Sequence, residues 1–147
     1  MGQRVWAVWA AALLLAGCQS QENGTKRDRE RLQGTWGLVR MVVDGKELTD
    51  GEVKRAYRLT FAGDRYTIRI AGRTEATGNY QLDEGTHPKA VDITPTEGPD
   101  RGKTSLGIYQ LDDGVLTVCA HDGQRPAQFF GEDSPTGLLI VLKREQP

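Results

Sequence analysis

The chain has few cysteines, few aromatic residues and no excess of basic charge. Of its 147 residues, two are cysteines (Cys18 and Cys119) and 7% are aromatic. Nineteen Lys and Arg residues stand against 20 Asp and Glu residues, for a net charge of −1. Proteins that bind nucleic acid usually carry a clustered basic excess. We therefore expect no nucleic-acid partner.

Catalytic and metal-binding motifs are also missing. The sequence contains no Gly-x-Ser-x-Gly, no phosphate-binding glycine loop and no Cys or His pair at metal-ligand spacing. Cys119 and His121 would share one face of a strand, but a nucleophile and its base also need an orienting group and an oxyanion site. We predict no catalytic residue, no metal and no cofactor, and we interpret Cys119 as a small buried residue.

Long hydrophobic runs are limited to one, residues 5–15, which follows Arg4. About eleven apolar residues are too few to cross a bilayer core of about 30 Å as a helix, and this layout is typical of an export signal. The run ends in Leu15-Ala16-Gly17-Cys18, which resembles the cleavage box of bacterial lipoproteins. The resemblance implies a signal peptide at residues 1–17 and acylation of Cys18 with diacylglycerol and a further chain such as palmitate. An ordinary signal peptide, cut nearby to leave Cys18 as a free thiol, is the alternative.

A polar segment separates Cys18 from the remainder. Residues 19–31 contain no aromatic or aliphatic side chain, so they cannot bury apolar surface and we expect a solvated tether. Residues 26–33 could form one or two helical turns. The predicted organisation is a signal peptide at 1–17, a lipidated cysteine with its tether at 18–31, and one domain at 32–147.

From Gly34 onward, apolar and polar residues alternate with period two between turn signals. The first strand ends at Asp44-Gly45, a strong hairpin pair, and the polar residues 47–55 could hold a short helix. The predicted strands cover residues 36–43, 57–61, 66–70, 73–82, 90–94, 104–111, 115–120 and 138–143. About eight antiparallel strands in sequence order favour an up-and-down β-barrel, because closure removes the exposed strand edges.

The side chains expected inside such a barrel are nearly all large, which favours a packed interior, with a cavity limited to one mouth. They are Trp36, Leu38, Tyr57, Leu59, Phe61, Tyr66, Ile68, Ile70, Tyr80, Leu82, Val91, Ile93, Tyr109, Leu111, Leu116, Val118, Leu138 and Ile140. If a ligand pocket exists, Trp36, Tyr80 and Tyr109 are the candidates to line it.

Short motifs along the domain carry a family resemblance. The segment Gly34-Thr35-Trp36 resembles the Gly-x-Trp opening of lipocalin-type barrels, in which an arginine often packs over the tryptophan. The resemblance makes Arg125 the candidate for this barrel-closing contact, worth about 0.5–2 kcal/mol; a solvated loop arginine and a ligand-pocket arginine that binds an anion are the alternatives. The whole domain is similar to an uncharacterised family of small exported domains known mainly from planctomycete bacteria. The shared pieces are Leu32-Gln33-Gly34-Thr35-Trp36, Asp44-Gly45, Gly63-Asp64, Gly78-x-Tyr80, Pro88-Lys89-x-x-Asp92, Gly107-Ile108-Tyr109, Leu116-x-x-Cys119 and Arg125-Pro126-x-x-Phe129.

This resemblance implies a lipocalin-like barrel and brings no activity and no functional residue with it. Together with Cys18, it predicts a non-enzymatic lipoprotein of the cell envelope, anchored to a membrane and facing the periplasm or the exterior. We expect a binding or interaction module for an envelope protein or polymer. One alternative is a carrier or sensor of a small apolar ligand held in the barrel, and an uncharacterised enzyme is the least favoured.

Overall fold

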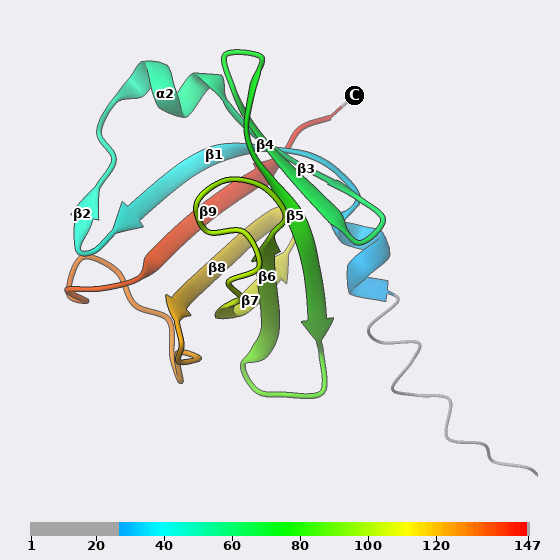
Figure 1. Cartoon of the computed structure of the whole chain (residues 1–147), viewed down its shortest axis with the longest axis vertical. Helices are drawn as coiled ribbons and strands as arrows, with labels where there is room; N and C mark the ends of the chain where they lie inside the picture. Colours follow the sequence, from blue (N-terminus) through cyan, green and yellow to red (C-terminus); the bar gives the residue numbers. More distant parts are fainter. Residues whose placement is uncertain (1–26, 147) are drawn as a thin grey trace, which may run out of the picture.

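The computed structural model of the chain describes residues 27–146. The predicted signal peptide, Cys18 and the first part of the predicted tether lie outside the described residues. The chain runs through a short helix at residues 27–32 and then through nine strands and a second short helix (Figure 1). Across this described part of the chain, no helix is long and apolar enough to cross a membrane.

The predicted antiparallel barrel is confirmed. Strand β1 pairs with β3, each later strand pairs with the next, and β9 pairs back onto β1, which closes a barrel of eight strands. The two-residue β2 is an appendage on β1. The elements are β1 (Gly34–Val43), β2 (Lys46–Glu47), α2 (Gly51–Ala56), β3 (Tyr57–Ala62), β4 (Arg65–Ile70), β5 (Arg73–Asp83), β6 (Lys89–Pro95), β7 (Ser105–Asp112), β8 (Val115–Asp122) and β9 (Leu138–Arg144).

Local chemistry accounts for the turns and for the start of α2. Asp44 and Gly45 both have positive φ, 50° and 77°, as a two-residue hairpin that matches the twist of its strands requires. Asp50 caps α2, because its Oδ1 accepts hydrogen bonds from the backbone N–H groups of Glu52 at 2.9 Å and Val53 at 3.2 Å. The hairpin at Asp44-Gly45 was predicted from the sequence, and the short helix expected within residues 47–55 forms at Gly51–Ala56.

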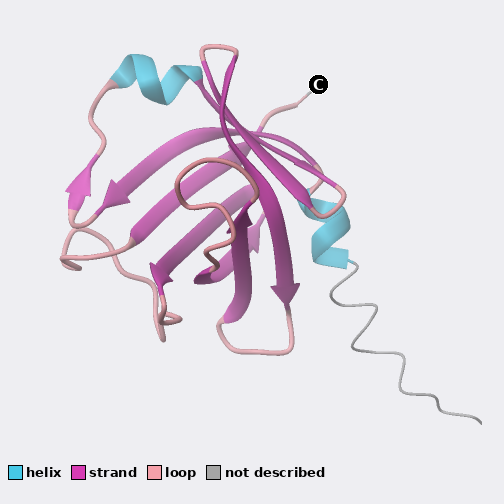
Figure 2. Ribbon diagram, viewed as in Figure 1, coloured by secondary structure: helices cyan, strands magenta, loops and turns pink. Residues whose placement is uncertain are grey.

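The barrel has two different ends, which lie at opposite ends of β1. We call the end where residues 27–32 pack, near Trp36, the closed end. The other end, where β1 and β8 finish and β7 and β9 begin, is the mouth. Figure 2 shows the two helices separated accordingly, with α2 close to the far end of β1.

All the side chains predicted to face inward belong to one apolar cluster or pack against it, and Leu32, Met41 and Leu142 join them. A second, smaller cluster lies on the outer side of the wall, where Phe129 and Phe130 of the loop before β9 pack on Val42, Ile108, Cys119 and Leu139. Cys119 is fully buried there, as expected for a small core residue, and burial raises the pKa of its thiol.

Candidate binding cavity

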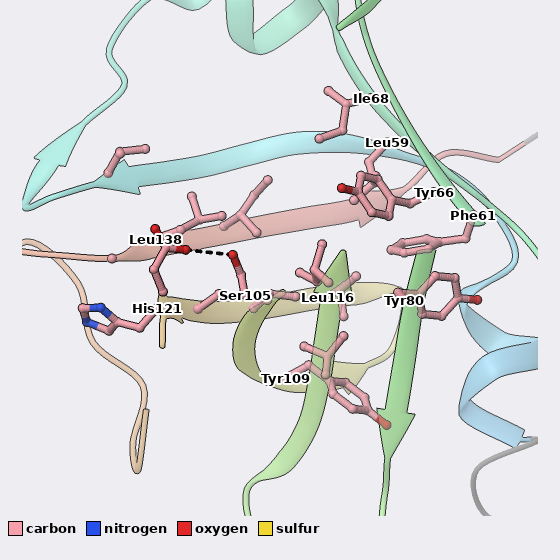
Figure 3. Close-up of a pocket in the computed structure, with 18 of the residues that line it drawn as sticks. Leu59, Phe61, Tyr66, Ile68, Tyr80, Ser105, Tyr109, Leu116, His121 and Leu138 are labelled. Carbon is pink, nitrogen blue, oxygen red and sulfur yellow. Dashed lines mark hydrogen bonds between the residues drawn. The ribbon is translucent and has the colours of Figure 1, made fainter. Parts of the chain in front are cut away.

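The barrel interior holds a cavity of about 760 Å³, walled mainly by the inward apolar side chains (Figure 3). Cavities that bind small molecules typically measure about 300–1,000 Å³. The prediction of a packed interior is therefore wrong. A list of large inward residues does not fix the diameter of the barrel, which depends on strand number and on the stagger between strands; eight strands here enclose more space than their side chains fill.

Trp36 and residues 27–33 shut the closed end. Trp36 is fully buried, and its Nε1 donates to the carbonyl oxygen of Leu32 at 2.8 Å. The guanidinium of Arg144 lies 4.5 Å from the centre of the indole ring, and its Nη1 donates to the carbonyl oxygen of Gln33 at 2.7 Å. A cation stacked on an aromatic face at this distance is attracted to the ring. Trp36 thus takes part in closing the barrel and does not line the cavity.

The expected contact of Arg125 with Trp36 is not formed, and Arg144 takes that place. Arg125 follows β8 at the mouth, whereas Trp36 lies at the closed end, so the length of the barrel separates them. The Arg125 guanidinium instead joins β6 to β7, because it donates to the carbonyl oxygen of Gly107 at 2.6 Å and to Asp92 at 2.7 Å. Arg144 reaches Trp36 because the last residue of β9 pairs with Trp36 across the seam of the barrel.

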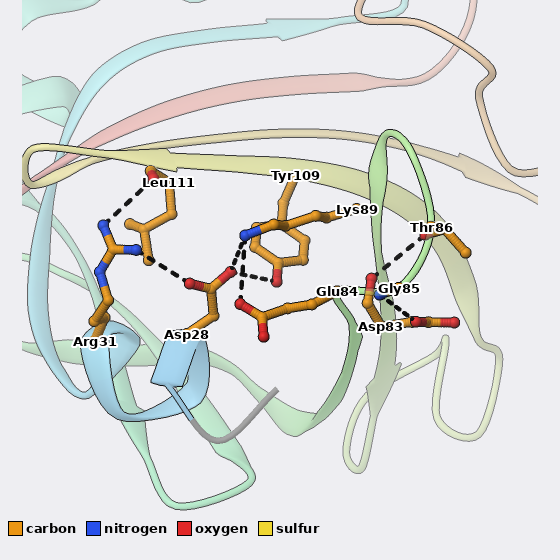
Figure 4. A network of polar contacts seen from close by, with 9 residues as sticks. All are labelled: Asp28, Arg31, Asp83, Glu84, Gly85, Thr86, Lys89, Tyr109 and Leu111. Carbon is orange, nitrogen blue, oxygen red and sulfur yellow. Dashed lines mark hydrogen bonds and ion pairs between the residues drawn. The ribbon is translucent and has the colours of Figure 1, made fainter. Parts of the chain in front are cut away.

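A polar network under the closed end is centred on Asp28 (Figure 4). The Asp28 carboxylate is 1% exposed and accepts from Lys89 Nζ at 2.8 Å, from the Tyr109 hydroxyl at 2.8 Å and from Arg31 Nη1 at 3.2 Å. Burial by itself would raise the pKa of Asp28, but its contacts with Glu84, Lys89 and Tyr109 and the charge of Lys89 lower it to about 2. Burial and the adjacent Asp28 raise the pKa of Glu84. The network fastens the helix to β6 and β7 through an ionised Asp28.

The burial of Asp28 corrects the expectation of a solvated segment up to Arg31. Helical turns were expected at residues 26–33, and the helix forms at 27–32. Asp28 and Leu32 are four residues apart and therefore share one face of that helix, and both are buried. The spacing of Leu32 from Asp28 was the available signal, but only the barrel supplies the partner Lys89.

Four tyrosines line the cavity, and they differ in how their hydroxyl groups are used. The predicted pocket residues Tyr80 and Tyr109 direct their hydroxyls out of the cavity, where Tyr80 donates to the carbonyl oxygen of Gly63 at 2.6 Å and Tyr109 donates to Asp28. Tyr57 and Tyr66 make no side-chain hydrogen bond with any described residue, although both are buried. Their place in the cavity wall was predicted from alternation; the unused hydroxyls were not.

Polar side chains gather at the mouth, where the sequence indicated no site. The Ser105 hydroxyl donates to Asp122 at 2.9 Å, and the Thr136 hydroxyl lies 3.4 Å from Nε2 of His121. The Asp44 carboxylate accepts from the backbone N–H of Gly137 at 2.9 Å, which holds the loop before β9 against the turn after β1. The cavity lining at the mouth therefore includes the carboxylates of Asp44 and Asp122 and the imidazole of His121.

Comparisons with known proteins add no family and no relative. No family model matches the chain, and neither a curated protein nor a solved structure matches it. Between residues 27 and 146, no group of three or more His, Cys, Asp or Glu side chains gathers as metal ligands would.

Proposed function

We propose that the protein is a non-enzymatic lipoprotein of the cell envelope, anchored by lipid on Cys18, whose barrel binds a small apolar ligand. The observation that carries the binding function is the cavity of about 760 Å³ with its largely apolar wall. Filling such a space with an apolar molecule removes hydrophobic surface from water on both partners. Binding of an envelope protein or polymer on the outer surface of the barrel has less support.

The outer surface offers little for a partner protein to bury. Within residues 27–146, the exposed large apolar side chains are Val39, Val43 and Val115. Val39 is the extra residue of a β-bulge in β1, between Leu38 and Arg40, which accounts for its exposure. Val115 begins β8, and β9 separates that strand from β1. Isolated apolar residues of this kind are normal on a protein surface and do not form an interaction patch.

Ligand binding is tested with N-phenyl-1-naphthylamine, an uncharged probe that becomes fluorescent in apolar surroundings. We expect the purified protein to bind the probe at about one molecule per chain. Val118→Trp, which places an indole into the cavity from β8, should weaken binding. Thr117→Trp is the matched control, because residue 117 is adjacent on the same strand, does not line the cavity and should leave binding intact. Equal binding by both variants would place the probe outside the barrel and refute the proposed function.

The anchor is tested separately with Cys18→Ser. Acyl chains contribute about 0.8 kcal/mol per buried methylene, and two or three chains together hold a protein firmly on a bilayer. We expect the unchanged protein to sediment with membranes, with its N-terminal peptide heavier by the mass of the lipid, and the variant to lose both properties. Cys119→Ser is the control and should keep both, because that thiol is buried in the outer cluster. An unmodified Cys18 in the unchanged protein would exclude lipidation.

A further inference from the structure

The unused hydroxyls of Tyr57 and Tyr66 are the chemically unusual feature of the cavity. The two side chains are 5% and 6% exposed and come from the paired strands β3 and β4. Glu84 Oε2 is the one fully buried side-chain polar atom without a partner among the described residues. The Tyr57 and Tyr66 hydroxyl oxygens, which also lack a protein partner, therefore reach the open space of the cavity, where a ligand group can bind them. Burial raises the pKa of both phenols, and the nearby Tyr66 adds to the effect at Tyr57. Both therefore present neutral O–H groups at neutral pH.

The position of Tyr66 is built into the neighbouring strand. A Cβ atom on Gly78 of β5 would lie 2.7 Å from Cε1 of Tyr66 and 2.3 Å from the carbonyl oxygen of Thr94. The missing side chain at residue 78 therefore leaves the space in which the tyrosine ring lies. Figure 3 shows the Tyr66 hydroxyl directed into the interior, whereas that of Tyr80 points away toward the helix at residues 27–32.

The charges around the cavity select against anions. The described residues that line it include the carboxylates of Asp44 and Asp122, and no lysine or arginine. A carboxylate or phosphate ligand would lose its hydration there without gaining a cationic partner. It would also pass two like charges at the mouth.

We propose that the ligand is an uncharged amphiphile, an apolar chain or ring system that carries a hydroxyl or carbonyl group, and that Tyr57 and Tyr66 bind this polar group from the β3–β4 wall. This inference rests on the proposed function, because it requires that the cavity is occupied. It adds what the apolar lining leaves open, namely the charge of the ligand and the residues that recognise its polar group.

Competition among three ligands of equal chain length tests the proposal. Dodecanol, dodecanoate and dodecylamine each displace N-phenyl-1-naphthylamine from the full chain carrying Cys18→Ser, so that no acyl chain of the protein itself competes. We expect dodecanol to displace the probe at a concentration at least about ten-fold lower than dodecanoate, given like-charge repulsion at a partly buried site. Asp122→Asn should lower the concentration of dodecanoate that displaces the probe and so bring it closer to that of dodecanol.

Phenylalanine variants assign the hydrogen bonds. Tyr57→Phe and Tyr66→Phe keep the ring and remove only the hydroxyl. We expect at least one of them to weaken the binding of dodecanol about three- to ten-fold and to change the binding of dodecanoate little. Tyr80→Phe is the matched control, because its hydroxyl is bound to Gly63 outside the cavity and its loss should leave the ratio of the two ligands unchanged.

Four results would overturn the inference. Dodecanoate binding as tightly as dodecanol would remove the selection against anions but leave the proposed function standing. Dodecylamine binding ten-fold more tightly than dodecanol would place the polar end of the ligand among the carboxylates of the mouth. Dodecanol binding that neither Tyr57→Phe nor Tyr66→Phe weakens would exclude the tyrosines. Failure of the probe and of all three ligands to bind would refute the proposed function as well.

Discussion

Replacing Asp28 should loosen the closed end of the barrel, and the effect should depend on pH in a defined way. A fall in the pKa of Asp28 from 3.8 to about 2 on folding corresponds to roughly 2 kcal/mol in favour of the ionised form. Asp28→Asn removes that charge while keeping an acceptor for Tyr109, so we expect a loss of about 2 kcal/mol at pH 7. Asp28→Ala also leaves the Tyr109 hydroxyl without its partner, and we expect about 1 kcal/mol more.

The sign follows from the direction of the shift. Because folding lowers the pKa of Asp28, its stabilisation is fully present above about pH 4 and is lost as the pH falls towards 2. Urea unfolding of the wild type and of Asp28→Asn should therefore give a difference in unfolding free energy that shrinks as the pH falls below about 4. Asp64→Asn, which replaces an exposed aspartate in the turn at the same end, is the control and should change the unfolding free energy by less than about 0.5 kcal/mol. A difference below about 0.5 kcal/mol at pH 7, or one independent of pH, would refute the account of the network.

Glu84 should behave with the opposite sign. Burial and Asp28 raise its pKa, so its favourable contribution is present at low pH and is lost as the pH rises through the folded-state pKa. Glu84→Gln is neutral at every pH, and we expect it to be more stable than the wild type at pH 7 and equal to it in acid. The same urea series measures this; a variant less stable at pH 7 would mean that the ion pair with Lys89 outweighs the repulsion from Asp28.

Two further predictions concern the wall and its closure. Arg144→Ala should lower the free energy of unfolding by about 1–2 kcal/mol and shift the fluorescence emission of Trp36, the one tryptophan left once residues 1–17 are removed. Arg125→Ala should leave that emission unchanged. The reverse result would restore the Arg125–Trp36 contact predicted from sequence. Gly78→Ala should destabilise the barrel by about 1–3 kcal/mol by overpacking against the carbonyl oxygen of Thr94 and the ring of Tyr66. A melting temperature equal to that of the wild type would show that β6 and the ring can both shift without cost.

The barrel itself could be predicted from sequence because its determinants are local. Alternation assigns a face to each residue within a strand, and pairs such as Asp44-Gly45 fix where a strand turns back. The inward positions could be named one by one for the same reason. The volume that they enclose could not, because it depends on how far each strand is shifted along its neighbour, which no short segment encodes.

The candidate site was likewise predictable only in part. Sequence placed Tyr57, Tyr66, Tyr80 and Tyr109 in the wall by alternation, and structure separated the pair with bonded hydroxyls from the pair without. For Tyr109 the deciding partner is Asp28, which is 81 residues away. The spacing of Leu32 from Asp28 indicated a shared helix face, but nothing in this polar segment indicated the partners that a buried carboxylate needs.

What the sequence by itself determined is therefore the order and facing of the strands and the positions of their turns, since each rests on interactions among residues a few positions apart. The tertiary structure decided which arginine covers Trp36, which aspartate is buried beneath the barrel and that the interior is hollow. The first and the last depend on closure of β9 onto β1, which brings Arg144 to Trp36 and fixes the circumference of the wall; the burial of Asp28 depends on Lys89 of β6 and Tyr109 of β7. Contacts across that seam join the two ends of the domain, and their partners are set by the geometry of the closed barrel.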